Sequence, residues 1–322
     1  MLNIDSDLYR KHPDWILSEG ARVPPTWRHE LVLDLANESA FNYVLESISK
    51  VILENNVKYI KWDHNRVLVD AGHLGRAGIH KQTKAIYRLF KELKVRCPGL
   101  EIESCASGGA RIDFGVIDYV DRFWVSDNND ALARQEIQRW TMQFISPELL
   151  GTHIGPSPSH QTGRELSLSF RGATALLGHA GIEWDLSQLD NEELGLLRKW
   201  IEFYKEKRAL IHSGESIRMD YPNDDHYLYG VVGKKESLFI FTSLRPTTTS
   251  HSPNLRLRGL DRSMNYQVTA VFPAGIPGMM LISPPGWLTE GVVTTGAILE
   301  EIGLPAPILQ PAQALIIEIK AI

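Results

Sequence analysis

Two short segments carry acidic side chains where a pair of carboxyl groups could act on one bond. In YIKWDHNR, Asp63 follows a strand-like run at 57–60, and in FWVSDNND, Asp127 follows a run at 123–125. The ends of parallel strands are where an α/β barrel places its chemistry. Two carboxyl groups that meet there could cleave a glycosidic bond, one as nucleophile and one as acid.

The residues around Asp63 suit the nucleophile. Lys61, Asp63 and Asn65 are spaced two apart, so on an extended backbone they point to the same side. A lysine beside a carboxylate favours its ionised form, and lysine and asparagine both bind hydroxyl groups. This pattern favours a sugar substrate. The plainer alternative is that Asp63 caps the next helix or pairs with Lys61.

The residues around Asp127 suit the proton donor. Trp124 precedes it closely, and an acid beside an aromatic wall is partly desolvated, which favours the protonated form. Upstream, Gly108 and Gly109 follow Cys105 and allow a backbone to approach a ligand closely. The alternative is an Asx turn or helix cap ahead of a helix at 131–143.

The elements that must position these residues alternate between helix and strand over the first two thirds of the chain. Apolar residues at helical spacing predict the helices, short β-rich runs predict the strands, and Asp190 predicts a helix cap. Strand and helix in this order indicate a parallel sheet. We expect helices at 37–55, 82–94, 131–144, 164–178 and 191–210, and strands at 57–61, 100–104 and 122–126.

The pattern changes after Gly214. Short runs rich in valine, isoleucine, phenylalanine and tyrosine are separated by proline and glycine clusters, which is typical of an all-β region. We therefore predict two domains, an α/β domain at 1–214 and an antiparallel β-sandwich at 215–322. The predicted strands of the second domain are 227–232, 237–243, 265–271 and 313–319.

Composition excludes several classes of partner. The net charge of −5 over 322 residues gives no basic field for nucleic acid. With only Cys97 and Cys105, a disulfide framework is not expected, which indicates a reducing compartment. No apolar run is long enough to span a membrane, so we expect a cytoplasmic protein. We expect no metal site, because four histidines that could bind a metal are spread along the chain without the spacing of metal ligands: His64, His153, His160 and His179.

Taken together, the motifs KWDHN, CASGG and SDN, in this order, resemble the α-galactosidases of glycoside hydrolase family 36. The resemblance also includes DSDLYRKHPDW near the start, RHELVLDL at 28–35 and GTHIGPSPSH at 151–160, and it covers most of residues 1–212. It implies a (β/α)8 TIM-type barrel and a retaining hydrolase that needs no cofactor. The implied substrates are α-galactoside oligosaccharides such as melibiose and raffinose.

The resemblance also implies roles for individual residues. Asp63 matches the nucleophile and Asp127 the acid/base, which a retaining mechanism would place about 5–5.5 Å apart. Trp124 matches an aromatic residue near the scissile bond. The residues that match sugar-hydroxyl ligands are Arg28, Lys61, Asn65, Cys105 and Gly108. Two alternatives stay open: a transglycosidase or α-N-acetylgalactosaminidase with the same chemistry, and a non-catalytic carbohydrate-binding remnant.

The sequence departs from the family pattern at its N-terminal side. The family's N-terminal β-sandwich and first barrel strands are not matched, so Met1 aligns after the third strand and the expected barrel is incomplete. An incomplete barrel exposes strand edges. We therefore expect a partner chain that carries the missing units, a homo-oligomer, or an open α/β sheet.

Overall fold

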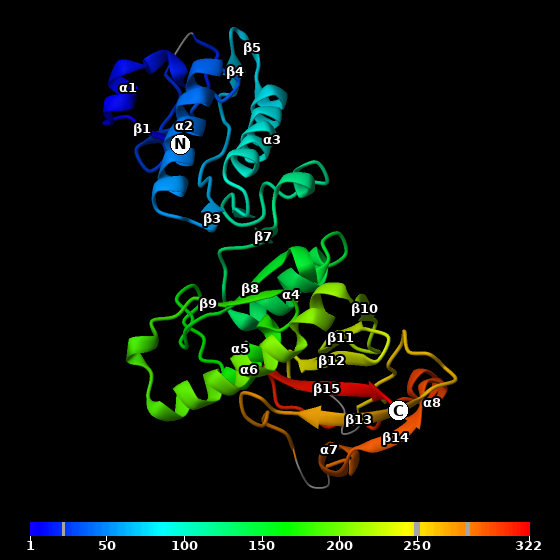
Figure 1. The fold of residues 1–322 in the computed structure, drawn as a ribbon. Coiled ribbons are helices and arrows are strands. Elements are labelled where there is room, and N and C mark those ends of the chain that lie inside the picture. The colour runs from blue at the N-terminus through cyan, green and yellow to red at the C-terminus, as the bar shows by residue number, and fades with distance from the viewer. Residues whose placement is uncertain (21–22, 248–251, 281–283) are drawn as a thin grey trace. The chain divides into compact units, whose positions relative to one another are not determined.

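The computed structural model describes residues 1–322 except 21–22, 248–251 and 281–283. The chain forms two compact units, residues 1–127 and residues 128–322, and each is described by itself (Figure 1). The change from helices and parallel strands to antiparallel strands expected at Gly214 falls inside the second unit, between the end of a helix at Ser213 and a strand that begins at Glu215. Where the two domains divide stays a prediction.

The first unit contains a parallel set of strands beside two long helices. β3 pairs with β6, with Tyr59 opposite Glu101 and Lys61 opposite Glu103, and β6 pairs in parallel with β7. Every strand and long helix predicted in this region is present, with ends shifted by a few residues. The bounds are β3 Tyr59–Trp62, β6 Glu101–Ser104, β7 Arg122–Trp124, α2 Glu38–Glu54 and α3 Ile79–Arg96.

The two long helices follow from capping and from one apolar face each. Asn37 caps α2 by accepting hydrogen bonds from the backbone N–H groups of Ser39 and Ala40. Arg88 on α3 stacks over the Phe41 ring of α2 at 3.6 Å and pairs with Glu38. The faces that these helices bury include Phe41, Leu45, Ile52, Leu89, Phe90 and Leu93. Apolar burial therefore fixes the helix pair that supports the strands.

Short elements complete the first unit. The glycine-rich segment at 72–78 forms a hairpin, β4 with β5, around Gly75. Its base is fixed because a Cβ on Gly72 would lie 2.3 Å from the backbone of Glu19, and because His73 contacts the buried Asp34 at 2.6 Å. The bounds are β1 Leu2–Asn3, α1 Asp7–Lys11, β2 Glu30–Leu31, β4 Gly72–His73, β5 Arg76–Ala77, and the 3-10 turns Pro13–Trp15 and Val116–Tyr119.

The second unit begins with helices and one parallel strand pair, β8 with β9. Asp190 caps its longest helix, α6, as predicted, by accepting from the N–H of Glu193. Short 3-10 turns span Pro147–Leu149 and Leu186–Gln188. The bounds are α4 Ala131–Thr141, β8 Leu150–Ile154, α5 Leu168–Ala175, β9 His179–Ile182 and α6 Asn191–Ser213.

The rest of the second unit is antiparallel β-structure, as the sequence indicates. Its strands form one six-stranded sheet in the order β10-β11-β12-β15-β13-β14. Helices α5 and α6 pack on one face of this sheet, and loops with short helices, α7 and α8, pack on the other. The bounds are β10 Glu215–Met219, β11 His226–Val232, β12 Glu236–Ser243, β13 Asn265–Val271, α7 Trp287–Glu290, β14 Val292–Thr295, α8 Gly296–Glu301 and β15 Gln313–Ala321.

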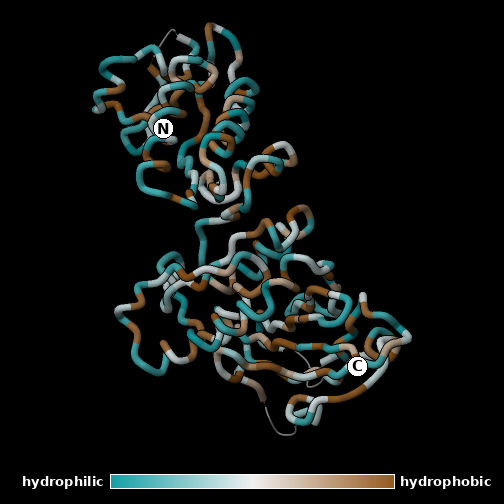
Figure 2. Tube along the Cα trace, viewed as in Figure 1, coloured by the Kyte–Doolittle hydropathy of each residue, from teal (hydrophilic) through white to brown (hydrophobic). Residues whose placement is uncertain are grey.

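Alternation along the central strands explains the two cores of this unit. Leu238 and Ile240 face the helices, whereas Phe239 and Phe241, one residue on, face the opposite side. Figure 2 shows the hydrophobic colouring along these strands. A strand that buries both of its faces reads as a continuous apolar run, and LFIF at 238–241 is such a run.

Candidate active site

The candidate active site lies on one face of the parallel strands in the first unit. Because side chains alternate along a strand, Lys61 and Asp63 share a face of β3 and its extension, and Glu103 and Cys105 share a face of β6 and its extension. Lys61 lies opposite Glu103 in the strand register. The site is therefore built in tiers, and Asp63 and Cys105 form the tier at the carboxyl ends of the strands.

Asp63 and Asp127 both contact the thiol of Cys105. The Cys105 Sγ lies 3.9 Å from Asp127 Oδ1, and the Asp63 carboxylate lies close enough to the same thiol to raise its pKa. The two carboxyl groups thus lie around one sulfur atom, although 64 sequence positions separate them. This convergence is the arrangement that the sequence could only propose.

The charge state of Cys105 suits contact with two acids. Burial raises the pKa of the thiol to about 11, the Asp63 contact also raises it, and a hydrogen bond with the Gly108 backbone opposes the shift. The side chain is buried, and neither cysteine forms a disulfide. At neutral pH Cys105 is therefore a neutral S–H group that can donate to a carboxylate.

Gly108 fixes the segment that carries Asp127. Its φ of +81° lies in the left-handed region, and a Cβ added there would lie 2.6 Å from Ser126 Cα and 3.1 Å from the Asp127 backbone nitrogen. Only glycine allows this approach without strain. The glycine expected to admit a ligand thus brings the backbone of 126–127 close to the loop after Cys105.

Lys61 has a different partner from the one expected. Its ammonium lies 4.0 Å from Glu103 Oε1 and 4.9 Å from the centre of the Trp124 ring. Asp63 instead accepts a hydrogen bond from the Asn65 side chain. The plainer alternative, in which Asp63 pairs with Lys61, is therefore not the pairing in this structure, because the strand register places Glu103 beside the lysine.

Trp124 and Asp127 also differ from the expected pairing. The Trp124 side chain is buried beside Lys61, whereas Asp127 is exposed. The expected desolvation of Asp127 by an aromatic wall is therefore not seen among the described residues. Side-chain alternation explains the difference, since Trp124 and Asp127 are three positions apart and belong to opposite sides of an extended chain.

Arg28 lies in an exposed turn next to β2. Its φ of +51° is in the left-handed region, and Trp27 pairs with Glu30 across the turn. Within the described part of the chain, Arg28 forms no hydrogen bond with the residues around Cys105. Its predicted role as a sugar ligand stays a prediction.

Sequence reasoning missed two partly buried groups near the site, His64 and Arg111. Burial lowers the pKa of His64 to about 4, and the positive charge of Arg111 adds to this effect. Burial also lowers the pKa of Arg111 to about 10, and its Nη1 donates to the Trp62 carbonyl and Ser104 Oγ, each at 3.3 Å. A pocket of about 380 Å³ lies beside them, lined among others by Arg66, Tyr87 and Ser107. In the sequence, the only sign that His64 belongs near the site is that it directly follows Asp63.

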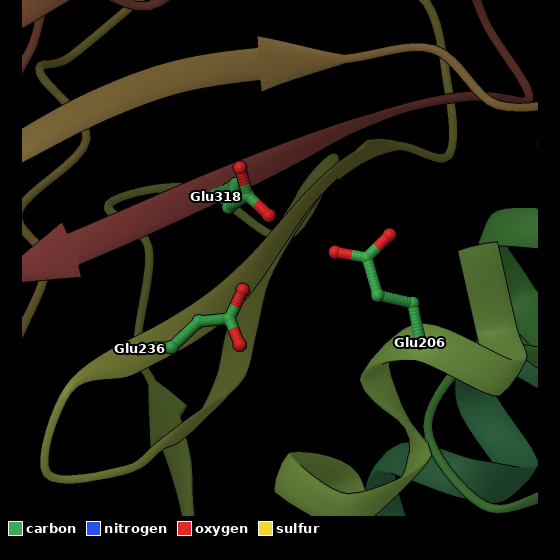
Figure 3. A group of neighbouring side chains, drawn as sticks. All are labelled: Glu206, Glu236 and Glu318. Atoms are coloured by element: carbon green, nitrogen blue, oxygen red, sulfur yellow. The ribbon is translucent and has the colours of Figure 1, made fainter.

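A second acidic group, far from this site in the sequence, has the spacing of metal ligands. Figure 3 shows Glu206 on α6 near Glu236 on β12 and Glu318 on β15. The ammonium of Lys207 donates to all three carboxylates, at 2.7 Å to Glu206. A lysine therefore occupies the place that a cation would take, and the cluster is an ion-pair network between α6 and the sheet.

No helix within the described ranges is long and apolar enough to cross a bilayer.

Comparison with known proteins gives concordant matches. The Melibiase family model matches residues 1–214. An α-galactosidase of Escherichia coli is 41% identical over 327 residues, and α-galactosidase AgaA of Geobacillus stearothermophilus is 33% identical over 277 residues. They match over 99% and 83% of this chain, respectively.

Solved structures give the same result. A crystal structure of glycoside hydrolase family 36 α-galactosidase AgaA in complex with raffinose superposes with a TM-score of 0.88 at 29% identity, covering 99% of this chain and 43% of that one. The galactosidase domain of the α-galactosidase-sucrose kinase AgaSK gives a TM-score of 0.85 at 29% identity, covering 99% of this chain and 42% of that one. The fold is therefore that of these enzymes, an incomplete (β/α)8 barrel followed by a C-terminal β domain.

The chain spans less than half the length of these relatives, 46% of the Escherichia coli protein and 38% of AgaA.

Proposed function

This chain belongs to the Melibiase family, and from that premise we propose that it acts as a glycoside hydrolase on terminal α-D-galactosyl residues of oligosaccharides such as melibiose and raffinose. One observation supports this proposal most directly: Asp63 and Asp127 lie around the single thiol of Cys105. A glycosidase uses a pair of carboxyl groups on either side of the glycosidic bond, and these two aspartates could form such a pair.

The proposed reaction is a double displacement. A carboxylate oxygen of Asp63 attacks the anomeric carbon while the Asp127 carboxyl group gives its proton to the leaving oxygen, which breaks the glycosidic bond and forms a galactosyl ester. Asp127, now ionised, removes a proton from a water molecule that attacks the same carbon. The ester bond breaks, Asp63 leaves as a carboxylate, and the configuration is retained.

The neighbouring groups supply binding and orientation in this proposal. The hydrogen bond from the Asn65 side chain orients the Asp63 carboxylate for attack. The Lys61 ammonium and the Cys105 thiol would contact sugar hydroxyl groups, together with Arg28 and the Gly108 backbone, beside Trp124. No step requires a cofactor.

Asparagine variants test the two roles. Asp63→Asn and Asp127→Asn should each lower the hydrolysis of an aryl α-galactoside by at least about 10³-fold, because each removes a group that takes part in bond breaking. The matched control is Asp118→Asn, an exposed aspartate in the same unit. Parent-like rates in either site variant would refute the assignment. An NMR spectrum of the first product would establish whether the configuration is retained.

A second candidate is a galactoside-binding subunit that gains activity with a partner chain or a second copy. The observation that favours it is the outer edge of β3, which no strand pairs with among the described residues. Calorimetric titration with galactose, run beside the hydrolysis assay, separates the two candidates. Binding with turnover supports the hydrolase, and binding without turnover supports the subunit.

The two buried cysteines, which form no disulfide, also favour a cytoplasmic location in this proposal.

A further inference from the structure

Glu103 is a buried acid directly below the proposed catalytic tier. Its side chain is only 1% exposed, and it precedes Cys105 by two residues on the same face. An ionised carboxylate in such a place is costly unless it is paired. The residues around Glu103 should therefore include a cation that it binds.

Lys61 is that cation. Its ammonium lies 4.0 Å from Glu103 Oε1, and this oxygen accepts no hydrogen bond from the residues that the structure describes. Tyr59 precedes Lys61 on the same face of β3, and burial, with the nearby Glu103 carboxylate, raises the pKa of its hydroxyl group. Lys61 is thus the positive charge that balances Glu103.

The same contact restrains Lys61. A lysine side chain has four flexible carbons and loses its position easily. Here the ammonium is held between the Glu103 carboxylate and the face of Trp124, 4.9 Å from the ring centre. The lysine side chain is still 37% exposed, so the ammonium is restrained and can still meet a ligand.

We propose that Glu103 is a positioning residue of this site, which acts by holding the Lys61 ammonium in place for a sugar hydroxyl group and away from Asp63. This inference rests on the proposed galactoside function for its consequence, but the contact itself can be tested without activity. Glu103 does not touch the substrate in this account.

Lysine acylation tests the restraint directly. In Glu103→Gln, the ammonium loses its counter-charge, and mass spectrometry after brief acetylation should show Lys61 modified several-fold faster than in the parent protein. The matched control is Glu101→Gln, which removes a carboxylate from the same face of β6 that pairs with Arg122 instead. Unchanged labelling of Lys61 in Glu103→Gln would overturn the proposal.

Galactose binding tests the consequence. Calorimetry should show affinity about tenfold weaker in Glu103→Gln, the loss expected when one charge-assisted hydrogen bond is no longer formed well. Lys61→Met should weaken binding at least as much, and Glu103→Gln added to Lys61→Met should weaken it no further. Independent, additive losses would overturn the proposal, since Glu103 would then act without Lys61.

The two readouts separate this inference from the proposed function. A parent protein that binds no galactose, with faster Lys61 labelling in Glu103→Gln, would refute the proposed function and support the contact. If Glu103→Gln does not fold by circular dichroism, Glu103→Asp keeps the charge and shortens the side chain by one methylene. Faster Lys61 labelling would again support the restraint, and parent-like labelling would overturn it.

Discussion

At the scale of single residues, the site depends on a close contact between two backbones. Gly108 touches the segment 126–127, and this segment ends in the proposed acid, Asp127. Any side chain at position 108 must move that segment or strain its own backbone. The position therefore controls both stability and the placement of Asp127.

Gly108→Ala is predicted to lower stability and activity together. The left-handed φ alone costs about 1 kcal/mol for a non-glycine residue, and the 2.6 Å contact adds to that cost. Gly75→Ala is the matched control, because Gly75 has a φ of +71° but no atom within 4 Å of its added Cβ. Urea unfolding should show a larger loss for Gly108→Ala than for Gly75→Ala. Equal losses would mean that the contact with Ser126 contributes nothing.

The site residues show what sequence reasoning can and cannot reach. Asp63, Asn65 and Cys105 were identified from motifs, and the structure brings them together. The Lys61–Glu103 pair was not predicted, because it depends on the register of two strands whose paired residues are 42 positions apart in the sequence. The burial of Trp124 and the exposure of Asp127 depend on tertiary packing, which a local pattern does not encode.

At the scale of elements, helix α6 is joined to the sheet by Lys207. Burial acts to lower the pKa of this lysine, but the hydrogen bonds that its ammonium donates to Glu206, Glu236 and Glu318 outweigh burial and raise the pKa above its usual 10.5. For Glu318, burial acts to raise the pKa, but Lys207 and Lys320 hold it below its usual 4.5. The network therefore stabilises the second unit at pH values between the lowered pKa of Glu318 and the raised pKa of Lys207.

Lys207→Met is predicted to destabilise the second unit by about 3–5 kcal/mol near neutral pH, because the partly buried carboxylates of Glu236 and Glu318 lose the cation that they share. In the parent protein the Glu318 contribution should be present above about pH 4.5 and disappear as the pH falls through its lowered pKa. The Lys207 contribution should be present below about pH 10.5 and disappear as the pH rises through its raised pKa.

Thermal unfolding across pH tests this prediction. The variant should show a flatter pH dependence than the parent protein at both limits. Lys205→Met is the control, since Lys205 is exposed on the same helix. An equal effect of both substitutions would contradict the role of the network.

Element boundaries were predicted where a physical signal marks them. Asn37 and Asp190 cap α2 and α6, and both helices begin where predicted within a residue. Helix α3 begins three residues earlier than expected, because Gly78 precedes it without a side-chain cap. The single six-stranded sheet was harder to predict from the sequence, because the pairing between β13 and β15 joins segments that are far apart in the chain.

At the scale of the whole molecule, strand β3 is an open edge. It pairs with β6 on one side, and among the described residues no strand pairs with its other side. The carbonyls of Lys58 and Trp62 accept hydrogen bonds from the β6 side, so the backbone of Tyr59 and Lys61 points outward. An open parallel edge is a template for another strand.

We therefore predict that the isolated chain associates through β3. Light scattering coupled to size-exclusion chromatography should give a mass above 36.3 kDa that rises with concentration. Tyr59→Pro removes an outward N–H group without breaking the ladder to β6, so it should favour the monomer, whereas Tyr59→Phe should not. A compact parent monomer at all concentrations would contradict this prediction.

The thiol of Cys105 can report on the charges in the site by infrared spectroscopy without an added label. Because it stays protonated and touches both Asp63 and Asp127, its S–H stretching frequency must respond to the charge on each. That vibration falls in a window where proteins absorb little infrared light. A native sulfur atom can thus serve as a spectroscopic gauge of the electric field in which the sugar bond would break.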